Sequence, residues 1–348
     1  MAVAACALAL ACDGRRAERS WNLPVETVHV RGVGATAPKA LLAKWIEQYS
    51  LVEPSTKLAY DAQGSGAGVK GAEDKTADFG VSDSALSNEE MAKVAGAVAH
   101  LPVAVEAIAI VYVLKGAPQG RLQVTEDLLA DLLNGTVLWW DDPAMASVNP
   151  GIKLPHTAVH VVYRGDDSGS SFVLSDWLSK TSARWARPAS RSLSLPVGVA
   201  AQRDDGMVAR LRATEGTLGY VSAVTALDEH LTSFAVRNPA GRFVSPSLEG
   251  MRAAAATAAL GGDLRARATA APGELAYPLC SFTFVLIQQQ GPDVARRRAI
   301  ARFLWWAIHD GQRFAPPLGF GALPGELMVR DEAVLRSLRA GSSSETAL

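Results

Sequence analysis

The segment Tyr163-Arg-Gly-Asp-Asp-Ser-Gly-Ser-Ser-Phe172 concentrates one guanidinium, two carboxylates and three serine hydroxyls in ten residues. An apolar, β-branched run at residues 159–162 precedes this segment, and residues 172–180 follow it with a pattern typical of a helix. The segment is therefore predicted to be a turn between a strand and a helix, where backbone N–H groups are exposed. Such N–H groups, hydroxyls and an Arg side chain together bind small tetrahedral oxyanions. We expect an anion site here.

The composition predicts a folded protein with more than one lobe. The chain has 348 residues, of which 49% are hydrophobic and 20% charged, so it is too long for one ordinary core and too apolar for disorder. The net charge of −1 offers no broad basic surface. Nucleic-acid binding is therefore not expected, whereas a single local anion site is compatible with this charge.

The N-terminus has features of an export signal. Residues 1–12 are apolar and too short to span a bilayer, but they suit the apolar part of a secretion signal, although no positive residues precede them. The ending Leu8-Ala-Leu-Ala-Cys12 is similar to a bacterial lipobox, which makes Cys12 a candidate lipid-carrying residue. An Ala-rich start without structure is the alternative. The three cysteines form neither a disulfide framework nor a metal-ligand spacing.

Two further segments are candidates for contact with an anion. Gly32-Val-Gly-Ala-Thr-Ala-Pro38 lies between a predicted strand at 25–30 and a predicted helix at 39–49. Thr36 at this helix start either caps the helix or binds an anion, and taken alone the cap is favoured. Residues 63–70 are predicted to form a Gly-rich loop that presents Ser65, and this loop lacks the Gly-Lys-Ser/Thr ending of a nucleotide P-loop.

Asp83 ends a predicted short strand at residues 77–83, and residues 88–99 after it are predicted to be helical. If Asp83 shares a pocket with Arg164, one interpretation is an ordinary salt bridge. The other is an acceptor that requires a proton on the ligand, because a buried carboxylate repels an anion that has no hydrogen to donate. Such a site would accept hydrogen phosphate and reject fully ionised sulfate.

Two apolar segments are predicted to be strands that cross between lobes. Residues 101–114 have the near-continuous apolar pattern of a strand buried on both faces, and residues 277–288 are similar. Helices are predicted at 125–134, with Thr125 as its cap and Gly135 as its stop, at 251–261 and at 292–310. His156 and His160 have the spacing of a helical metal pair, but their surroundings predict a strand, so no metal site is expected.

Several motifs in one order resemble the periplasmic or lipid-anchored phosphate-binding proteins of bacterial phosphate ABC transporters. The first is Gly32-Val-Gly-Ala-Thr-Ala-Pro38 with Lys44-Trp45, the second combines residues 60–70 with 77–83, and the third is residues 163–172. Trp140-Asp-Asp-Pro143, Asn149-Pro-Gly151 and residues 216–221 match further landmarks outside the binding site. The resemblance covers nearly the whole mature chain.

The resemblance implies an α/β, two-lobe periplasmic-binding-protein fold of type 2. Each lobe is expected to be a mixed sheet flanked by helices, with the ligand in the cleft between lobes. Residues 1–20 would be the signal or lipoprotein-like segment and tether, 21–103 the first part of lobe 1, 104–277 lobe 2, and 278–348 the second part of lobe 1. The protein would be exported to the periplasm or cell envelope.

The resemblance also implies a set of phosphate-binding residues: Thr36, Ala37, Ser65, Asp83, Arg164, Asp166, Ser168, Gly169 and Ser170. Ala37 stands where the family often has an aromatic residue, so only its backbone N–H is expected to contribute. Asp166 is expected to hold Arg164, and Asp167 to face solvent. No cofactor, metal or catalytic residue is implied. The expected partners are inorganic phosphate and the membrane permease and ATPase of a transporter, and the protein is expected to be a monomer.

Two other functions are compatible with parts of the sequence. The fold could bind another tetrahedral oxyanion, such as sulfate or molybdate, although Asp83 argues against both. Ser168 lies in Gly165-Asp-Asp-Ser-Gly169, which is similar to the nucleophile motif of serine proteases apart from an extra Asp. No His-containing segment suggests a partner base, so a serine hydrolase is less favoured.

Overall fold

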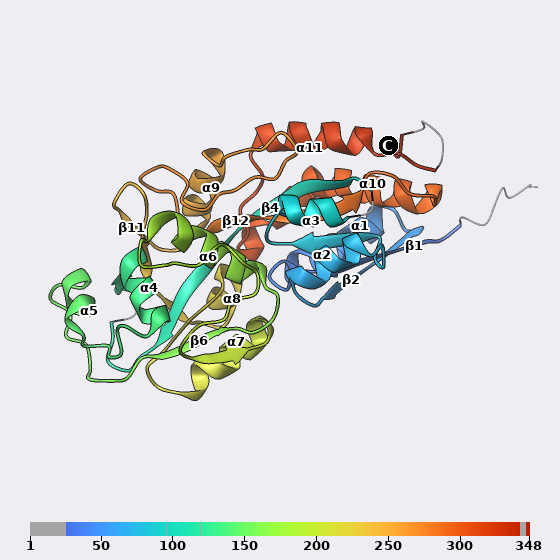
Figure 1. Ribbon diagram of the computed structural model, residues 1–348. Coiled ribbons are helices and arrows are strands. Elements are labelled where there is room, and N and C mark those ends of the chain that lie inside the picture. The colour runs from blue at the N-terminus through green and yellow to red at the C-terminus, as the bar shows by residue number, and fades with distance from the viewer. Residues whose placement is uncertain (1–25, 95, 119, 342–345) are drawn as a thin grey trace, which may run out of the picture.

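The computed structural model describes residues 26–94, 96–118, 120–341 and 346–348. Figure 1 shows an elongated molecule with two halves. One half contains β1–β3, α1–α3, α10 and α11, and the other contains α4–α8. The long strands β4 and β12 run from one half into the other. Cys12, the candidate lipidation site, lies outside the described residues.

The strands form one nine-stranded sheet and one small sheet. In spatial order, the large sheet consists of β2 (Thr56–Ala62), β1 (Val28–Gly34), β3 (Phe79–Ser82), β12 (Cys280–Gln288), β4 (Val98–Val113), β8 (Thr217–Ser222), β6 (His160–Arg164) and β7 (Val199–Ala201), with β9 (Thr232–Ser233) beside β4. The small sheet consists of β11 (Phe243–Val244), β10 (Ala235–Arg237) and β5 (Gln123–Val124).

Helices cover the sheet in both halves. The helices are α1 (Lys39–Val52), α2 (Ser65–Glu73), α3 (Asn88–Lys93), α4 (Glu126–Asn134), α5 (Pro143–Val148), α6 (Gly169–Thr181), α7 (Arg203–Ala213), α8 (Ala223–Asp228), α9 (Leu248–Ala256), α10 (Val294–Ile308) and α11 (Gly325–Ser337). Two 3-10 helices, η1 (Asp310–Phe314) and η2 (Pro316–Leu318), connect α10 to the segment before α11.

Strand β4 joins the two halves by changing its partner. Its residues up to Ala107 pair with β12, whereas those from Ile108 onward pair with β8, and both pairings are antiparallel. Every residue of β4 before Val113 is buried. The prediction of a strand buried on both faces is therefore confirmed, because the near-continuous apolar sequence matches a strand covered by helices on each side.

The parallel pairings bring several strand ends to common edges. Strand β1 is parallel to both β2 and β3, so the carboxyl ends of these three strands lie together. In the other half, β6 is parallel to β7 and β8. Ligands of open α/β sheets bind outside the carboxyl ends of parallel strands, where helix N-termini also begin. The chain passes from β1 to α1, from β2 to α2 and from β6 to α6 at these edges.

The prediction of a Gly-rich loop at residues 63–70 was wrong, because Ser65 begins helix α2. The glycines allow this helix to pack closely on strand β3. A Cβ atom added at Gly68 would lie 2.0 Å from the carbonyl oxygen of Val81, and one added at Gly80 would lie 2.1 Å from the carbonyl oxygen of Gly68. The glycine pattern therefore reflects close helix-to-strand contact rather than an irregular loop.

Other sequence predictions had mixed outcomes. Helix α4 is capped by the Thr125 hydroxyl, which accepts a hydrogen bond from the Leu128 N–H, and it ends at Gly135 with φ of 73°, as predicted. The helix predicted at 88–99 ends at Lys93, and strand β4 starts at Val98. His156 lies outside the strands, whereas His160 begins β6. Helices α5 and α11 were not predicted.

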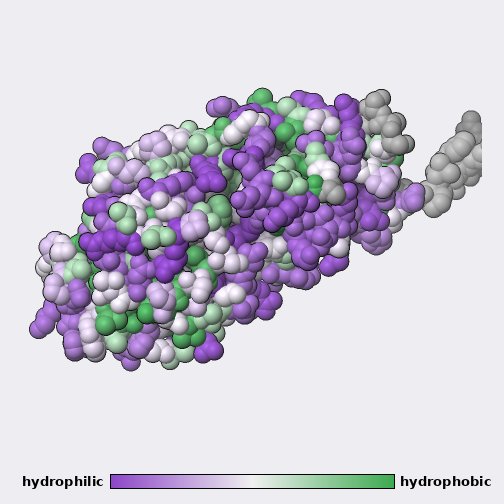
Figure 2. Space-filling view, in the orientation of Figure 1, coloured by the Kyte–Doolittle hydropathy of each residue, from purple (hydrophilic) through white to green (hydrophobic). Residues whose placement is uncertain are grey.

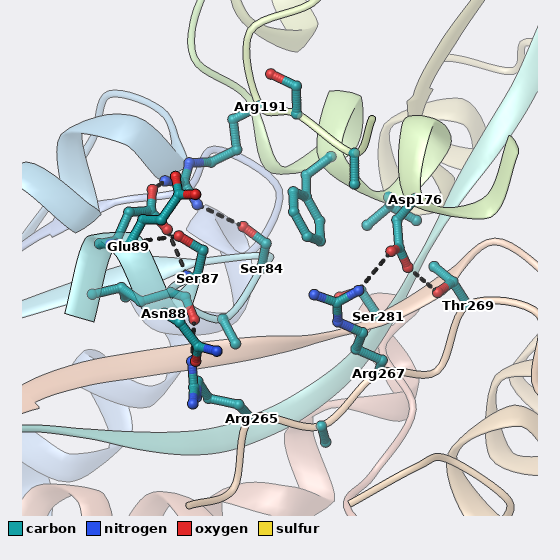
Figure 3. A pocket seen from close by; sticks show the side chains of 18 of the residues that line it. Ser84, Ser87, Asn88, Glu89, Asp176, Arg191, Arg265, Arg267, Thr269 and Ser281 are labelled. Atoms are coloured by element: carbon teal, nitrogen blue, oxygen red, sulfur yellow. Dashed lines mark hydrogen bonds and ion pairs between the residues drawn. The ribbon is translucent and has the colours of Figure 1, made fainter. Parts of the chain in front are cut away.

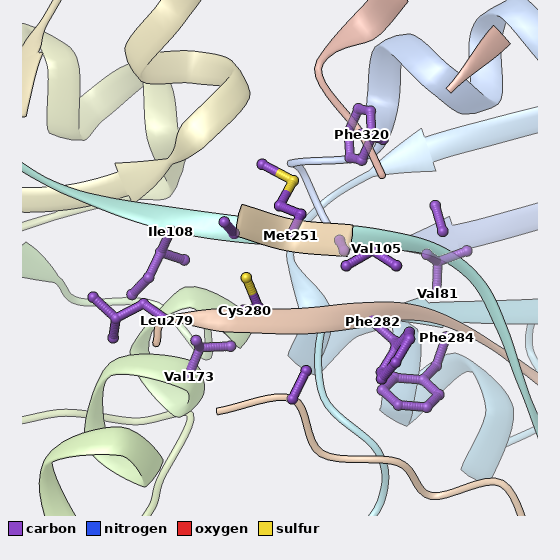
Figure 4. Packing of buried hydrophobic residues seen from close by; sticks show 14 of the residues in the cluster. Val81, Val105, Ile108, Val173, Met251, Leu279, Cys280, Phe282, Phe284 and Phe320 are labelled. Atoms are coloured by element: carbon purple, nitrogen blue, oxygen red, sulfur yellow. The ribbon is translucent and has the colours of Figure 1, made fainter. Parts of the chain in front are cut away.

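One apolar cluster extends through both halves of the molecule. Figure 4 shows its centre, where side chains of β4 and β12 contact neighbouring elements. Val105 of β4 lies near Met251 of α9 and Phe320, while Phe282 and Phe284 extend from β12 on the other side. Burial of these side chains stabilises the junction by roughly 25 cal/mol per Å² of apolar surface. The junction between the halves is thus part of the core.

The outer surface mixes polar and apolar residues. Figure 2 shows hydrophilic residues gathered over α2 on the visible face. Within the described part of the chain, no helix combines the length and apolar character needed to span a membrane.

Helix α11 buries an acidic side chain, Asp331, which is 0% exposed and whose two carboxylate oxygens have no hydrogen-bond partner among the described residues. Burial raises the pKa of Asp331 to about 9. This pKa lies above the pKa of an Asp in the unfolded chain. The free energy of unfolding contributed by protonated Asp331 is therefore largest below about pH 4 and decreases as the pH rises toward 9.

We expect Asp331→Asn to stabilise the folded protein near pH 7, because Asp331 must take up a proton when the chain folds at this pH and the amide need not. The gain is on the order of 2 kcal/mol, because the buried amide leaves its own donors unpaired. Urea unfolding at pH 4 and pH 8 measures this effect, and Asp228→Asn at an exposed position is the control. Parallel pH profiles for the wild type and Asp331→Asn would contradict the prediction.

Candidate anion-binding site

Segments from both halves meet at one buried cluster. Ser65 begins α2, Asp83 follows β3, and Gly169 begins α6. A Cβ atom added at Gly169 would lie 2.5 Å from the Asp83 Cβ and 2.6 Å from the Ser65 Oγ. The structure therefore brings the two sides of the sequence-predicted site into direct contact, and it explains why glycine is needed at position 169.

The N-terminus of α6 supplies hydrogen-bond donors to this cluster. Helix α6 begins at Gly169 instead of the predicted Phe172, and Ser168 caps it by accepting a hydrogen bond from the Ser171 N–H at 3.4 Å. Ser168, Gly169 and Ser170 are all buried. The first N–H groups of a helix have no partner within it, and the helix dipole favours a negative charge there. A buried N-terminus of this kind can hold an anion.

Arg164, the last residue of β6, is fixed between two carboxylates. Its side chain is 2% exposed. The Nε and Nη2 atoms donate to the two oxygens of Asp166 at 2.7 and 2.5 Å, and Nη1 donates to Asp204 at 2.7 Å. These bonds use three of the five N–H groups of the guanidinium. The prediction that Asp166 holds Arg164 is thus confirmed as a contact, and two N–H groups of the fixed fork remain for other acceptors.

Electrostatics keep this ion pair charged. Burial acts to raise the pKa of Asp166, but the hydrogen bonds and charge of Arg164 and the Arg203 N–H outweigh it, so this pKa lies below its usual range. Burial likewise disfavours the charged form of Arg164, but Asp166 and Asp204 raise the pKa of the guanidinium above its usual value. The stability contributed by Asp166 is present above the pH at which an unfolded Asp titrates and is lost as the pH falls through its lowered pKa.

Asp83 is a buried carboxyl group beside hydroxyl donors. It is 4% exposed, and its Oδ2 accepts a hydrogen bond from Ser65 Oγ at 3.3 Å, while Ser65 Oγ accepts one from the Asp83 N–H at 3.2 Å. Burial raises the pKa of Asp83 to about 6, and the negative charge of Asp204 adds to this shift. Hydrogen bonds from Glu106 and Ser65 and the charge of Arg164 act in the opposite direction. Asp83 is thus ionised at neutral pH and has no ion-pair partner among the described residues.

Thr36 and Ala37 lie between β1 and α1. Helix α1 begins at Lys39 with Pro38 at its cap position and no side-chain cap, so the interpretation of Thr36 as a cap was wrong. The Thr36 hydroxyl is half-buried and has no hydrogen-bond partner among the described residues. Ala37 is buried. Thr36 therefore keeps a free hydroxyl at the carboxyl edge of β1.

A polar cavity of about 950 Å³ borders the cluster. Figure 3 shows arginines from different segments around it, with Arg191 directed toward Ser84, Arg265 toward Asn88, and Arg267 toward Asp176. Its lining includes neighbours of the site residues, such as Ser84, but none of the nine residues predicted to bind an anion. The cavity is therefore beside the cluster, which is itself buried.

Contacts along this cavity connect the two halves. The Gly66 N–H donates to the Asp167 carbonyl at 3.0 Å, and Arg191 forms a hydrogen bond with Ser84 at 3.2 Å and an ion pair with Glu90. Asp167 is exposed, as predicted, and its side chain accepts a hydrogen bond from Ser192. The two halves are therefore in contact over the buried cluster.

Ser168 has no hydrogen-bonded base among the described residues. Ser168 is engaged as the cap of α6, and no described histidine forms a hydrogen bond with it. Within the described ranges there is also no group of three or more His, Cys, Asp or Glu residues that could hold a metal ion. The cluster presents hydrogen-bond donors and the Asp83 carboxylate.

Comparison with known proteins agrees with this geometry. Residues 22–310 match the model of the PBP superfamily domain. The phosphate-binding protein PstS of Xylella fastidiosa (strain 9a5c) is 33% identical over 312 residues, which cover 88% of this chain and 85% of the relative. The chain belongs to the PstS family of the PBP superfamily.

Solved structures show the same fold at lower sequence identity. A high-affinity periplasmic phosphate-binding protein (PfluDING), solved with phosphate bound, has a TM-score of 0.72 and 20% identity, covering 88% of this chain and 93% of its own. A phosphate ABC transporter substrate-binding protein from Clostridium perfringens, also with bound phosphate, has a TM-score of 0.63 and 14% identity, covering 85% of this chain and 100% of its own. The type 2 periplasmic-binding-protein fold expected from the sequence is confirmed.

In this member of the PstS family, three buried residues were missed by the sequence analysis. Asp204 lies in the first turn of α7 and holds Arg164. Tyr220 of β8 accepts a hydrogen bond from the Arg164 backbone N–H through its hydroxyl at 3.1 Å. Glu106 lies in the middle of β4 and is 4% exposed. Its signal in the sequence was a single carboxylate within an apolar strand, which requires a specific partner when buried.

We expect Gly169→Ala to weaken anion binding in this member of the PstS family, because the added methyl group would collide with Asp83 and Ser65 and hold the two halves apart. Overpacking of this kind costs about 1–3 kcal/mol, or roughly a 10- to 100-fold loss of affinity. Titration calorimetry with phosphate measures the effect. Gly325→Ala, where an added Cβ has no neighbour within 4 Å, should bind as the wild type does.

Proposed function

We propose that this protein captures inorganic phosphate outside the cytoplasm and delivers it to an ABC transporter. The observation that carries the proposal is the buried Asp83 carboxylate facing hydroxyls and the N-terminus of α6. Donors alone would accept any small oxyanion. An ionised acceptor among them favours a ligand that still carries a proton, and phosphate is such a ligand at neutral pH whereas sulfate is not.

The nine predicted residues have distinct roles in this proposal. The hydroxyls of Thr36, Ser65 and Ser170 and the N–H groups of Ala37, Gly169 and Ser170 would donate to phosphate, and Ser168 would cap the helix that presents them. Arg164, held by Asp166, would donate through its remaining N–H groups. The names of the relatives, which are phosphate-binding proteins, support this assignment.

The net charge of the side chains around the proposed phosphate site explains why many hydrogen-bond donors are needed. Arg164 supplies one positive charge, and Asp166, Asp204 and Asp83 are carboxylates around it. The side chains of the cluster therefore do not neutralise an anion. Binding would depend on oriented N–H dipoles and hydroxyls, which stabilise a buried charge without adding a counter-charge.

The halves of the molecule would act as two lobes that close on the ligand. We propose lobe boundaries near those inferred from the sequence, with lobe 1 formed by 21–103 and 278–348 and lobe 2 by 104–277. The change of partner along β4 and the contacts between Asp167 and Gly66 support this division. Closure would bury phosphate between the lobes.

The remaining parts of the proposal concern cellular context. The protein would act as a binding protein rather than an enzyme, as an exported monomer, with Cys12 as a possible point of lipid attachment. Its partners would be the permease and ATPase of a transporter, which supply the energy for transport. The names of two proteins with the same fold, a phosphate ABC transporter substrate-binding protein and a periplasmic phosphate-binding protein, support the transporter and the location outside the cytoplasm.

Calorimetric titration of the purified, phosphate-stripped protein tests the proposed function. Phosphate should bind tightly at a single site, and sulfate at the same concentrations should give no heat of binding. Sulfate binding as tight as phosphate binding would favour the alternative of another tetrahedral oxyanion. Labelling of Ser168 by a fluorophosphonate probe would favour a hydrolase instead.

A further inference from the structure

Glu106 is a second buried acid beside the Asp83 carboxyl group. Glu106 is on β4 opposite Ser281 of β12, and the Ser281 hydroxyl donates to the Asp83 carbonyl at 2.6 Å. The side chains of Glu106 and Asp83 are within hydrogen-bonding range of each other. Both residues are 4% exposed. A second acid therefore contacts the acid that the proposed function assigns to ligand selection.

The two carboxyl groups cannot both be ionised at low cost. The Asp83 Oδ1 and Glu106 Oε2 atoms are buried and receive no hydrogen bond from other described residues. Two buried carboxylates in contact repel each other and leave these oxygens without donors, whereas one shared proton satisfies both. The geometry therefore requires that the pair hold a proton.

The proton belongs on Glu106, because the donors lie around Asp83. Ser65 Oγ donates to Asp83 Oδ2 at 3.3 Å, and Gly169 at the N-terminus of α6 packs against Asp83. Glu106 Oε2 has no donor among the described residues. Burial raises the pKa of Glu106 well above its usual range, and the charge of Asp83 adds to the shift, while the Thr283 hydroxyl opposes it. The pKa of Asp83 rises only to about 6 because Arg164 and hydrogen bonds favour its ionised form. The pair titrates as a unit, and the donors around Asp83 leave Glu106 neutral and Asp83 charged at neutral pH.

The other titratable groups near Asp83 and Glu106 do not supply the negative charge or the proton of the pair. The Tyr60 hydroxyl donates to the Ala35 carbonyl at 2.6 Å. Burial and the charge of Asp83 raise the pKa of Tyr60 well above the usual value. Cys280 of β12 lies near Glu106, and burial likewise raises the pKa of its thiol. Both stay protonated at neutral pH. Asp204 from α7 and Arg164 from β6 are the other charged groups that act on Asp83.

We propose that Glu106 is a positioning residue that remains protonated and donates a hydrogen bond to Asp83, which keeps Asp83 ionised and directs its other lone pairs toward the proton of phosphate. This inference rests on the proposed function. Because Glu106 is neutral, it adds no second negative charge beside Asp83. Its hydrogen bond also favours the ionised form of Asp83 over the protonated form. A protonated Asp83 would be a donor and would accept sulfate.

Two substitutions separate the donor role of Glu106 from its volume. Glu106→Gln keeps an N–H donor to Asp83 and should bind phosphate within about threefold of the wild type. Glu106→Leu fills similar space without a donor, so phosphate affinity should fall about 10- to 100-fold, as for a lost hydrogen bond to a charged group. Between pH 6 and 7.5, where Asp83 of the wild type is ionised, sulfate binding should become measurable in Glu106→Leu and remain absent in Glu106→Gln.

Equal behaviour of the two variants in these titrations, whether both bind as the wild type or both lose binding, would overturn the proposal. The wild-type titration distinguishes failure of the proposed function from failure of the role proposed for Glu106. If the wild type binds no phosphate, both the proposed function and the role of Glu106 in selectivity are wrong. If the wild type binds and the variants do not differ from each other, only the role of Glu106 fails.

An infrared measurement tests the proton itself and does not depend on Glu106→Leu folding. The ligand-free wild type at pH 7.5 should show the carbonyl stretch of a buried protonated carboxyl, and Glu106→Gln should lose part of this band. Asp331 is another buried acid with a raised pKa, about 9, so Asp331→Asn is the matched control that identifies its share of the band. A band that Glu106→Gln leaves unchanged would overturn the proposal.

Discussion

Arg164→Ala should bind phosphate at least about a hundredfold more weakly than the wild type. The substitution removes the donor fork and leaves Asp166 and Asp204 buried without their shared cation. Loss of one partner from a buried charge pair costs about 3–5 kcal/mol, which corresponds to a loss of affinity of several hundredfold or more. Titration calorimetry or equilibrium dialysis with phosphate measures the change.

Two further variants define the cause of this effect. Arg164→Lys keeps a positive charge but not the planar fork, so its affinity should fall between those of Arg164→Ala and the wild type. Arg212→Ala removes an exposed arginine that pairs with Glu229 away from the site, and it should bind as the wild type does. Unchanged phosphate affinity in Arg164→Ala would show that the site has been assigned to the wrong residues.

Asp83→Asn should greatly reduce the discrimination between phosphate and sulfate. The amide removes a buried negative charge and can donate to a sulfate oxygen, whereas the carboxylate can only accept when ionised. A site built around one hydrogen-bond pattern strongly rejects ligands that lack it, so the ratio of the two affinities should fall by about 100- to 1,000-fold. Parallel titrations with phosphate and sulfate at pH 7.5 measure this ratio.

The ligand-free form of the same variant provides a pH signature. The pKa of Asp83 in the folded protein, about 6, lies above its unfolded value, so wild-type stability is complete below about pH 4 and decreases as the pH rises to 6. Asp83→Asn should lack this decrease. Asp205→Asn, an exposed neighbour of the site, is the control for both measurements. Persistent rejection of sulfate by Asp83→Asn would place selectivity elsewhere.

The sequence predicted those strands that have a long apolar run and those helices that have clear capping residues. Strand β4 and helix α4 were recognised because one has a continuous apolar run and the other has Thr125 and Gly135 at its ends. Helix α2 was missed because its glycines lower intrinsic helix propensity, and tertiary packing on β3 overrides that preference. Helix α11 lacked a side-chain cap and was also missed.

The site was predictable where its residues form local motifs. Residues 163–172 combine the strand end, the arginine and the helix start in one segment, so their proximity follows from sequence alone. Asp204 and Glu106 reach the site from distant elements, α7 and β4, and carry no local motif. Their involvement follows from strand order, which no short pattern in a single sequence specifies.

The order of strands in the large sheet also governs when the protein can fold during synthesis. Strand β12, at residues 280–288, lies between β3 and β4, which are made much earlier. A nascent chain that ends before β12 therefore lacks the central strand of its first half, and β3 and β4 have no direct partner between them. Such long-range pairing slows folding. The polypeptide must be almost complete before its sheet can close, so the facing edges of β3 and β4 remain unpaired until β12 has been made.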